Sequence, residues 1–419
     1  MDKNRYSLIV AGAGFSGVAA AVTAARQGLN VLLIEQGNCA GGAAANCLVN
    51  PFMPYWTKID GKTQNLSAGF FTEIINELKA AKALKDNNMT FNEEYLKLLL
   101  NDVLIQNNVN ILYNTTVIDS SVEEGKIKSI TVFNKSGKQE FFADYFIDAT
   151  GDADLAVMSG VPCNKGRESD GLCQPMTLCF RVGNISDNFT REEKQRIDIV
   201  YEQYKAEGKI TNPREDVLVF MTTSPHILHF NTTRIVKLDP TDGFDITKAE
   251  IEARKQVFEI FDMLKKEIRG FESSVLLSTA SKIGVRESRQ IHGEHLLTAE
   301  ELKDCTVFED SIAVGNYDID IHNPEGSGTS HYFFPEGKYY TIPYRSLVAK
   351  GIDNLLAAGR CISATHEAQA SVRIMPICCC LGEAAGAAAA VAVNNKTTFK
   401  DTPIKQIQKI ITDNGGKIF

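Results

Sequence analysis

Apolar runs alternate with glycines and small residues at the start of the chain, and this pattern predicts a strand, a helix and a second strand. The first apolar run, residues 8–11, ends at a glycine, which is typical of a buried strand. The residues after Gly17 are rich in alanine, which indicates a thin helix that ends at Gly28. A second apolar run, 31–34, ends at Glu35. The pattern predicts a β-α-β unit.

The turn of this unit has the glycine pattern of a nucleotide-binding loop, in the residues Gly12, Ala13, Gly14, Phe15, Ser16 and Gly17. Gly12 permits the tight turn, Gly14 lets the backbone approach a pyrophosphate, and Gly17 lets the helix lie close to the sheet. The helix N-terminus offers free N–H groups and a positive dipole end to phosphates. The alternative is a glycine-rich turn in an ordinary α/β core.

Glu35 lies 23 residues after Gly12, at the end of the second strand. An acidic side chain there can accept hydrogen bonds from both ribose hydroxyls of an adenosine. An acid also disfavours a 2′-phosphate, so the pattern indicates FAD or NAD and not NADP.

Hydrophobic periodicity also predicts the later elements, and residues 161–340 differ in character from the rest. Thr90 and Glu93 have the spacing of a capping box before one of the helices. Helices are expected at 65–84, 95–105, 191–207, 247–268, from Pro376 onward and at 407–412. Strands are expected at 109–113, 122–142 (a hairpin or meander), 145–148, 176–182, 217–222, 226–230 and 354–357.

Composition narrows the function classes. The chain has 419 residues, 44% hydrophobic and 23% charged, with a net charge of −8, which disfavours nucleic acid and anionic membrane surfaces as partners. The longest candidate for a membrane span, 384–393, is too short, and the first apolar run breaks too early for a signal peptide, so we expect a cytoplasmic protein. The ten cysteines lack the spacing of a metal or iron–sulfur site, so no metal is expected.

With these motifs, the chain resembles the bacterial FAD-dependent oxidoreductase family, related to the glutathione-reductase and fumarate-reductase type flavoproteins. The resemblance rests on 12–17, Glu35, the Gly41-Gly42 pair, 286–289, and 357–386. It implies an α/β fold, with a three-layer FAD-binding Rossmann-like domain and an inserted mixed α+β substrate domain. The implied boundaries are 1–160 and 345–419 for the FAD-binding domain and 161–344 for the insertion.

The resemblance implies FAD as the cofactor and adds further candidate contacts to those of the glycine loop. Val117 would lie near the adenine, and a strand ending in Ala149-Thr150-Gly151 would return beside the phosphates. The family's late strand usually ends in Gly-Asp, but Arg360 follows Gly359 here and could meet the pyrophosphate instead. The candidates implied in this way are Gln36, Gly41, Gly42, Val117, Ala149, Thr150, Gly151, Gly359, Arg360, Met375 and Ile377.

The implied reaction is hydride transfer between flavin N5 and a small polar or anionic organic substrate. No second glycine pattern occurs, so a dedicated NAD(P)H domain is not expected and the electron partner is open. His366 is the first candidate for acid–base chemistry. The candidates for orienting an anionic or polyhydroxylated substrate are Arg286, Arg289, Arg345 and Arg373, and His322 and His331 are weaker candidates.

Three alternatives stay open at this stage. The enzyme could reduce an activated double bond, or the chain could be a module with a structural or redox-sensing flavin. The arginines could also be structural partners of Glu287 and Glu367 at a domain interface. A homo-oligomer is possible.

Overall fold

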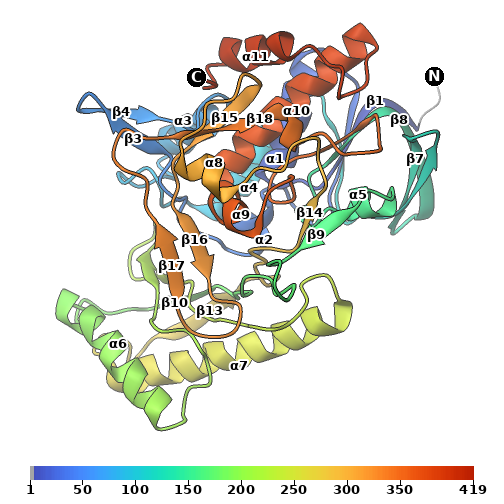
Figure 1. The fold of residues 1–419 in the computed structure, drawn as a ribbon. Coiled ribbons are helices and arrows are strands. Elements are labelled where there is room, and N and C mark those ends of the chain that lie inside the picture. Colours follow the sequence, from blue (N-terminus) through green and yellow to red (C-terminus); the bar gives the residue numbers. More distant parts are fainter. Residues whose placement is uncertain (1–3) are drawn as a thin grey trace.

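The fold is described from a computed structural model, which covers residues 4–419 (Figure 1). Its main sheet has the strand order β5-β2-β1-β8-β7-β6, and β19 also pairs with β8. Strands β5, β2, β1, β8 and β19 are parallel, whereas β6, β7 and β8 form an antiparallel meander. The strands are β1 (Arg5–Ala11), β2 (Val31–Ile34), β5 (Asn110–Leu112), β6 (Thr116–Glu123), β7 (Lys126–Asn134), β8 (Gly137–Asp148) and β19 (Leu355–Ala357).

Alternating side chains of the parallel strands build two hydrophobic cores, one on each face of the sheet. Leu8 and Val10 of β1 belong to the core on the helical side, and Ile9 and Ala11 belong to the core under the meander. The arrangement is therefore three layers, as predicted. The helices on the first side include α1 (Phe15–Arg26), α3 (Phe70–Ala80), α4 (Glu93–Gln106), α10 (Met375–Asn395) and α11 (Ile404–Asp413).

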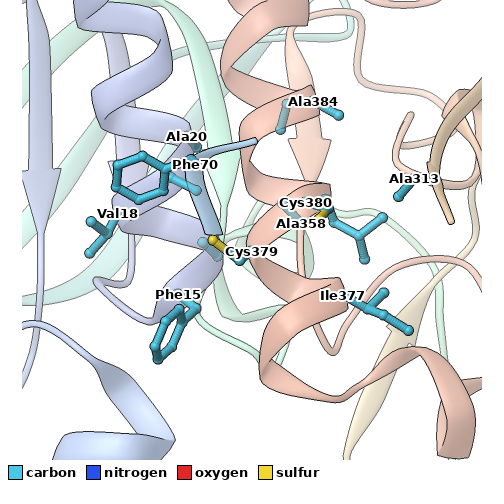
Figure 2. Packing of buried hydrophobic residues seen from close by; sticks show 14 of the residues in the cluster. Phe15, Val18, Ala20, Phe70, Ala313, Ala358, Ile377, Cys379, Cys380 and Ala384 are labelled. Carbon is cyan, nitrogen blue, oxygen red and sulfur yellow. The ribbon is translucent and has the colours of Figure 1, made fainter. Parts of the chain in front are cut away.

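Helices α1 and α10 cross closely because glycines of α10 face the backbone of α1 (Figure 2). A Cβ atom at Gly382 would lie 2.0 Å from the carbonyl oxygen of Ser16, and one at Gly386 would lie 2.3 Å from that of Ala20. Helix α10 is long and apolar enough to cross a membrane, but 94% of its apolar window is buried inside the molecule, as in a core helix of a globular protein.

A second unit has its own hydrophobic core, formed by residues between Met176 and Ile283 together with Leu48. One face of a four-stranded antiparallel sheet, in the order β11-β12-β10-β13, contributes Phe180 and Phe230 to this core beside the long helix α7. The elements are β10 (Phe180–Gly183), α6 (Arg191–Ala206), β11 (Val219–Met221), β12 (Leu228–Phe230), α7 (Gly243–Glu267) and β13 (Val275–Thr279).

Residues 297–344 pack into the core of the first unit, although they follow the second unit in sequence. A hairpin of β16 and β17 extends from this segment toward the second unit (Figure 1). The predicted boundaries 161 and 344 stay predictions, and we propose a smaller insertion, 176–285.

The remaining elements are α2 (Gly42–Asn46), β3 (Trp56–Ile59), β4 (Lys62–Asn65), α5 (Asp154–Met158), β9 (Cys163–Lys165), β14 (Arg289–Ile291), α8 (Ala299–Lys303), β15 (Ser311–Gly315), β16 (Ile319–His322), β17 (Thr329–Tyr332), β18 (Tyr340–Pro343) and α9 (His366–Val372).

Several predicted element boundaries were wrong. The helix expected at 65–84 is shorter, because Gly69 takes a positive φ of 64° and starts α3 only at Phe70. The strand expected at 176–182 begins at Phe180, since Met176 and Thr177 form only isolated bridges. The helix expected at 247–268 starts earlier, because the Asp242 carboxylate accepts hydrogen bonds from the first-turn N–H groups of α7. The last helix is longer than 407–412 at both ends.

The predicted capping box of Thr90 and Glu93 was also wrong. The N-cap of α4 is Asn92, whose side chain accepts a hydrogen bond from the Tyr95 N–H at 3.0 Å. Glu93 instead forms a bidentate ion pair with Arg181 of β10. This pair is one of the direct contacts between the two units.

Candidate active site

The glycine loop between β1 and α1 has the geometry of a phosphate-binding turn. Gly12 has a positive φ of 95°, and a Cβ there would lie 2.4 Å from the Ala149 carbonyl oxygen. A Cβ at Gly17 would lie 1.7 Å from the Gly12 oxygen, so both positions require glycine for the fold itself. Gly14 differs, because a Cβ there has no protein atom nearer than the Gly42 Cα at 4.0 Å. The space beside Gly14 is open, as a dinucleotide pyrophosphate requires.

The first turn of α1 has no side-chain cap, so its N–H groups are available to a phosphate. Ser16 lies in this turn, and its hydroxyl donates to the Cys378 carbonyl of α10 at 2.9 Å. Gly41 and Gly42 both have positive φ, and a Cβ at Gly42 would lie 2.8 Å from the Gly14 Cα. The glycine pair therefore lets its loop close against the phosphate-binding turn.

Glu35 is buried at the end of β2, where two backbone N–H groups hold its carboxylate. One oxygen accepts from the Ala13 N–H at 2.7 Å, and the other accepts from the Gly37 N–H at 2.6 Å. These bonds fix the carboxylate beside the glycine loop, in the place expected for a ribose-binding acid. Gln36 next to it is exposed, and Val117 is half-buried at the start of β6.

The loop after β8 brings Ala149, Thr150 and Gly151 next to the late strand β19. Arg360, which follows this strand, donates to the Asp152 carboxylate at 2.8 Å and to the Ser288 hydroxyl at 3.1 Å. Burial opposes the charge of this guanidinium, but Asp152 outweighs burial and raises the pKa of Arg360. Arg360 thus bridges both parts of the first unit to 286–289, and its contact with a pyrophosphate stays a prediction.

Helix α10 begins at Met375, with Pro376 in its first turn and no side chain capping it. Its first-turn N–H groups are therefore open to a partly negative ligand atom. Gly359 has a positive φ of 97°, and a Cβ there would lie 2.4 Å from the Ser16 hydroxyl, so the late strand approaches α1 closely. The glycine loop, the late strand and the N-terminus of α10 therefore lie next to one another.

His366 and Glu287 form a buried pair, although 79 positions separate them in the sequence. The Nδ1 atom of His366 lies 2.7 Å from one Glu287 carboxylate oxygen, and the other oxygen accepts from the Gln174 N–H at 2.8 Å. A carboxylate only accepts hydrogen bonds, so Nδ1 carries the proton and Nε2 is left as the basic atom. The pair has the arrangement of a base and its orienting group.

Arg286 precedes Glu287 and is a half-buried guanidinium without a carboxylate partner among residues 4–419. It donates to the Pro175 carbonyl at 2.7 Å and to the Thr177 hydroxyl. Burial lowers the pKa of Arg286 to about 9, and the positive charge of Arg373 acts in the same direction. Both bonds use one nitrogen, Nη1, and within the described chain the other two nitrogens have no hydrogen-bond partner.

Arg373 lies just after α9, and its Nη2 atom is 3.6 Å from the Asp320 carboxylate of β16. Tyr317 donates to the same carboxylate oxygen at 3.0 Å, and His322 Nε2 lies 3.4 Å from it. Sequence reasoning missed Asp320 and Tyr317. A sequence signal for Asp320 was present, because the polar residues Asp318, Asp320 and His322 alternate with isoleucines. Such alternation is typical of a strand with one polar face.

The other two candidate arginines and His331 have partners elsewhere. Arg289 pairs with Asp154 at 2.6 Å, and the partly exposed Arg345 pairs with Asp310 at 3.0 Å. His331 pairs with Asp318 on the outer part of the hairpin. By contrast, α9 and the adjacent 286–287 segment carry or adjoin the three predicted catalytic residues, His366, Arg286 and Arg373.

Comparison with solved structures finds many similar folds. The flavin-dependent brominase Bmp2 has a TM-score of 0.50 at 10% sequence identity, over 98% of this chain and 84% of that chain. A geranylgeranyl bacteriochlorophyll reductase-like protein from Thermoplasma acidophilum has a TM-score of 0.48 at 11% identity, over 98% and 83% of the two chains. At these identities the likeness concerns the fold. Comparison with curated proteins found no match.

The family described as FAD dependent oxidoreductase matches residues 7–411. This match agrees with the open space at Gly14, the fixed carboxylate of Glu35 and the uncapped first turns of α1 and α10, all of which suit FAD. The protein is therefore an enzyme of oxidoreductase type whose cofactor is FAD, and it belongs to the FAD-dependent oxidoreductase family.

Proposed function

We propose that this oxidoreductase exchanges a hydride with a small polar or anionic organic substrate that binds between the glycine-loop unit and the inserted unit. FAD supplies the hydride acceptor or donor at its N5 atom. The proposal rests on the contact between two segments. Arg286 and Glu287 follow the insertion, and they lie beside α9, which begins at His366 and is followed by Arg373.

In this proposal Arg286 and Arg373 hold the substrate through charge-assisted hydrogen bonds. His366 takes or returns the substrate proton at Nε2, while Glu287 keeps its ring in the required tautomer and orientation. Gln369 of α9 donates to the Arg286 carbonyl at 3.0 Å, so the same helix positions the base and the arginine.

The test is anaerobic spectroscopy of the FAD-loaded protein with a panel of sugars, polyols, hydroxy acids and enoates. A reduced substrate of a dehydrogenase bleaches the flavin, and an enoate reoxidises the reduced flavin if the enzyme is a reductase. We expect one of these two responses. If no class of compound changes the flavin in either redox state, the proposed reaction is wrong.

A second experiment tests the role of His366. Replacing His366 with Ala is expected to lower turnover by about 10²–10⁴-fold with little change in flavin content, because only the proton transfer is lost. Glu287→Gln should also lower turnover strongly and alter its pH profile, since an amide that donates to Nδ1 favours the tautomer with the proton on Nε2, which cannot act as the base. The control is His292→Ala, because His292 binds Asn164 away from these groups. Unchanged turnover in His366→Ala would contradict the assignment.

A further inference from the structure

The cluster around Asp320 contains two guanidinium groups, Arg286 and Arg373, and one carboxylate. Arg286 and Arg373 each contribute one positive charge, and Asp320 contributes one negative charge. Burial opposes ionisation of Asp320, but the hydrogen bond from His322 and the arginine charges outweigh it and lower the pKa of Asp320. The Tyr317 phenol stays neutral, since burial and Asp320 raise its pKa.

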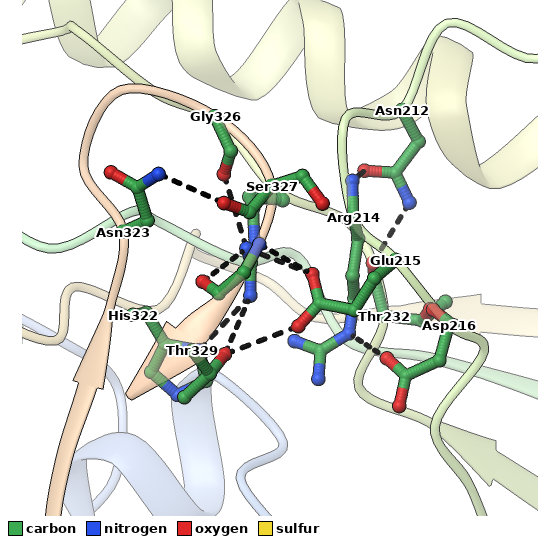
Figure 3. Close-up of polar contacts among 12 residues, drawn as sticks. Asn212, Arg214, Glu215, Asp216, Thr232, His322, Asn323, Gly326, Ser327 and Thr329 are labelled. Atoms are coloured by element: carbon green, nitrogen blue, oxygen red, sulfur yellow. Dashed lines mark hydrogen bonds and ion pairs between the residues drawn. The ribbon is translucent and has the colours of Figure 1, made fainter. Parts of the chain in front are cut away.

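His322 lies beside Thr329 of the neighbouring strand (Figure 3), and its hydrogen bonds make it neutral. Its Nδ1 atom lies 3.1 Å from Nη2 of Arg234, and a guanidinium can only donate, so Nδ1 carries no proton. The proton is therefore on Nε2, which faces Asp320 at 3.4 Å. Burial lowers the pKa of His322 to about 3, in agreement with a neutral ring.

The neighbouring arginines of the inserted unit have carboxylate partners of their own. Arg234 lies 3.1 Å from the Glu215 carboxylate, and Arg214 lies 2.7 Å from that of Asp216 (Figure 3). On the hairpin, Asp318 pairs with His331. Two guanidinium groups therefore face the single carboxylate of Asp320, while the Glu287 carboxylate is held by His366 and the Gln174 N–H.

Unused hydrogen-bonding atoms lie in the same place. Nε of Arg373 is buried without a hydrogen-bond partner in the described chain. Three groups contact the Oδ2 atom of Asp320, whereas Oδ1 has no hydrogen bond within residues 4–419 and lies 3.8 Å from His331 Nδ1. A buried guanidinium edge without an acceptor is costly, so an anionic group of the substrate is the natural partner.

We propose that the substrate presents a single carboxylate to Arg286 and Arg373, and that Asp320 excludes substrates with a second negative charge nearby. This inference rests on the proposed function and narrows its substrate class to monocarboxylates. Asp320 neutralises part of the positive charge and repels a second carboxylate, so it is a specificity-determining residue.

The experiment compares butyrate and succinate, which share a four-carbon chain and differ by one carboxylate, as ligands of the FAD-loaded protein. Binding is followed by the flavin absorbance difference spectrum, at a pH where both succinate carboxylates are ionised. We expect butyrate to bind roughly tenfold or more tightly than succinate, because a second charge a few ångströms from Asp320 is strongly repelled. Asp320→Asn should abolish or reverse this preference.

The control is Asp353→Asn, which removes the same charge from a half-exposed carboxylate beside Lys126 and should keep the wild-type ratio. Arg373→Gln should weaken butyrate binding, and it replaces Asp320→Asn as the test if that variant does not fold. Equal or tighter succinate binding by the wild type would overturn the inference, as would an unchanged ratio in Asp320→Asn. If neither acid binds, the inference about monocarboxylates is also wrong. The proposed function is tested separately, because flavin bleaching by a neutral polyol would still support hydride transfer.

Discussion

Three glycines of one loop serve different purposes, which the sequence pattern alone does not separate. Gly12 and Gly17 are required by the protein itself, since a Cβ at either position would lie within 2.4 Å of a carbonyl oxygen. Gly14 has an ordinary φ of −67° and open space beside it. The first two positions therefore preserve the fold, and we propose that the third keeps space open for the cofactor.

Replacing Gly14 with Val is expected to abolish FAD binding while leaving the apoprotein folded, because the new side chain would occupy the place of the pyrophosphate. Flavin content after reconstitution and the far-UV circular dichroism spectrum measure the two effects. Gly17→Val is the matched comparison, and we expect it to lose the fold, since its Cβ would lie 1.7 Å from the Gly12 oxygen. A Gly14→Val protein that still binds FAD would contradict the assignment of this space.

At the scale of elements, the regular β-α-β start and the late strand followed by α10 were predictable, because their periodicity and glycine positions are local. The predicted boundaries at 65–84 and 176–182 were wrong because they depend on features of the folded chain that periodicity does not show. A single positive φ at Gly69 delays α3, and the segment around Thr177 bridges to Gly284, more than a hundred positions away. Glu93 has the spacing of a capping residue, but its partner is Arg181 in the other unit.

The close crossing of α1 and α10 gives a test of element packing. Gly386→Ala is expected to destabilise the protein by about 1–3 kcal/mol, since the added methyl would lie 2.3 Å from the Ala20 carbonyl oxygen and push the helices apart. The change in the free energy of unfolding is measured by denaturant titration. Gly243→Ala in α7 is the control, because a Cβ there has no protein atom within 4 Å and should cost little.

Glu383 gives α10 a pH-dependent contribution to stability. Its carboxyl group accepts hydrogen bonds from the Phe70 N–H at 3.1 Å and the Asn414 amide at 3.0 Å, and burial raises its pKa from 4.5 to about 7. The folded protein thus keeps a proton that the unfolded chain loses. Stability therefore falls as the pH rises from about 4.5 to about 7, by roughly 3 kcal/mol for this group.

Glu383→Gln should remove this fall, because an amide does not ionise. Thermal unfolding of both proteins across this pH range measures the difference, which we expect to favour the variant increasingly toward pH 7. Glu77→Gln changes an exposed carboxylate of the neighbouring α3 and should follow the wild type. A difference that does not vary with pH would show that folding leaves the pKa of Glu383 unchanged.

At the scale of the whole molecule, the site exists only because distant segments meet. The predicted catalytic residues come from 286–287 and 366–373, and their convergence depends on the insertion folding back onto the first unit. Periodicity within one segment does not show which distant segments it contacts in the fold. The sequence therefore pointed to His366 and Arg286 but not to Asp320. The hairpin that brings Asp320 and His322 to the site is itself held by Arg234 of the inserted unit (Figure 3).

Arg234 is 1% exposed and contacts the hairpin and its own unit at once. It donates to the carbonyl oxygens of Gly326 at 3.1 Å and Gly328 at 3.0 Å and pairs with Glu215 at 3.1 Å. Its removal would leave the Glu215 carboxylate without its cation and several buried acceptors without a donor. We therefore expect Arg234→Ala to lower the free energy of unfolding by about 3–5 kcal/mol.

The same variant should weaken substrate binding more than FAD binding, because His322 loses the donor that fixes its tautomer while the glycine loop is untouched. Denaturant titration, flavin content and the flavin difference spectrum with butyrate measure the three effects. Arg254→Ala is the control, since it breaks a more exposed pair with Glu250 at 2.9 Å and should cost about 1 kcal/mol or less. If both variants cost the same, Arg234 is not what holds the hairpin against the inserted unit.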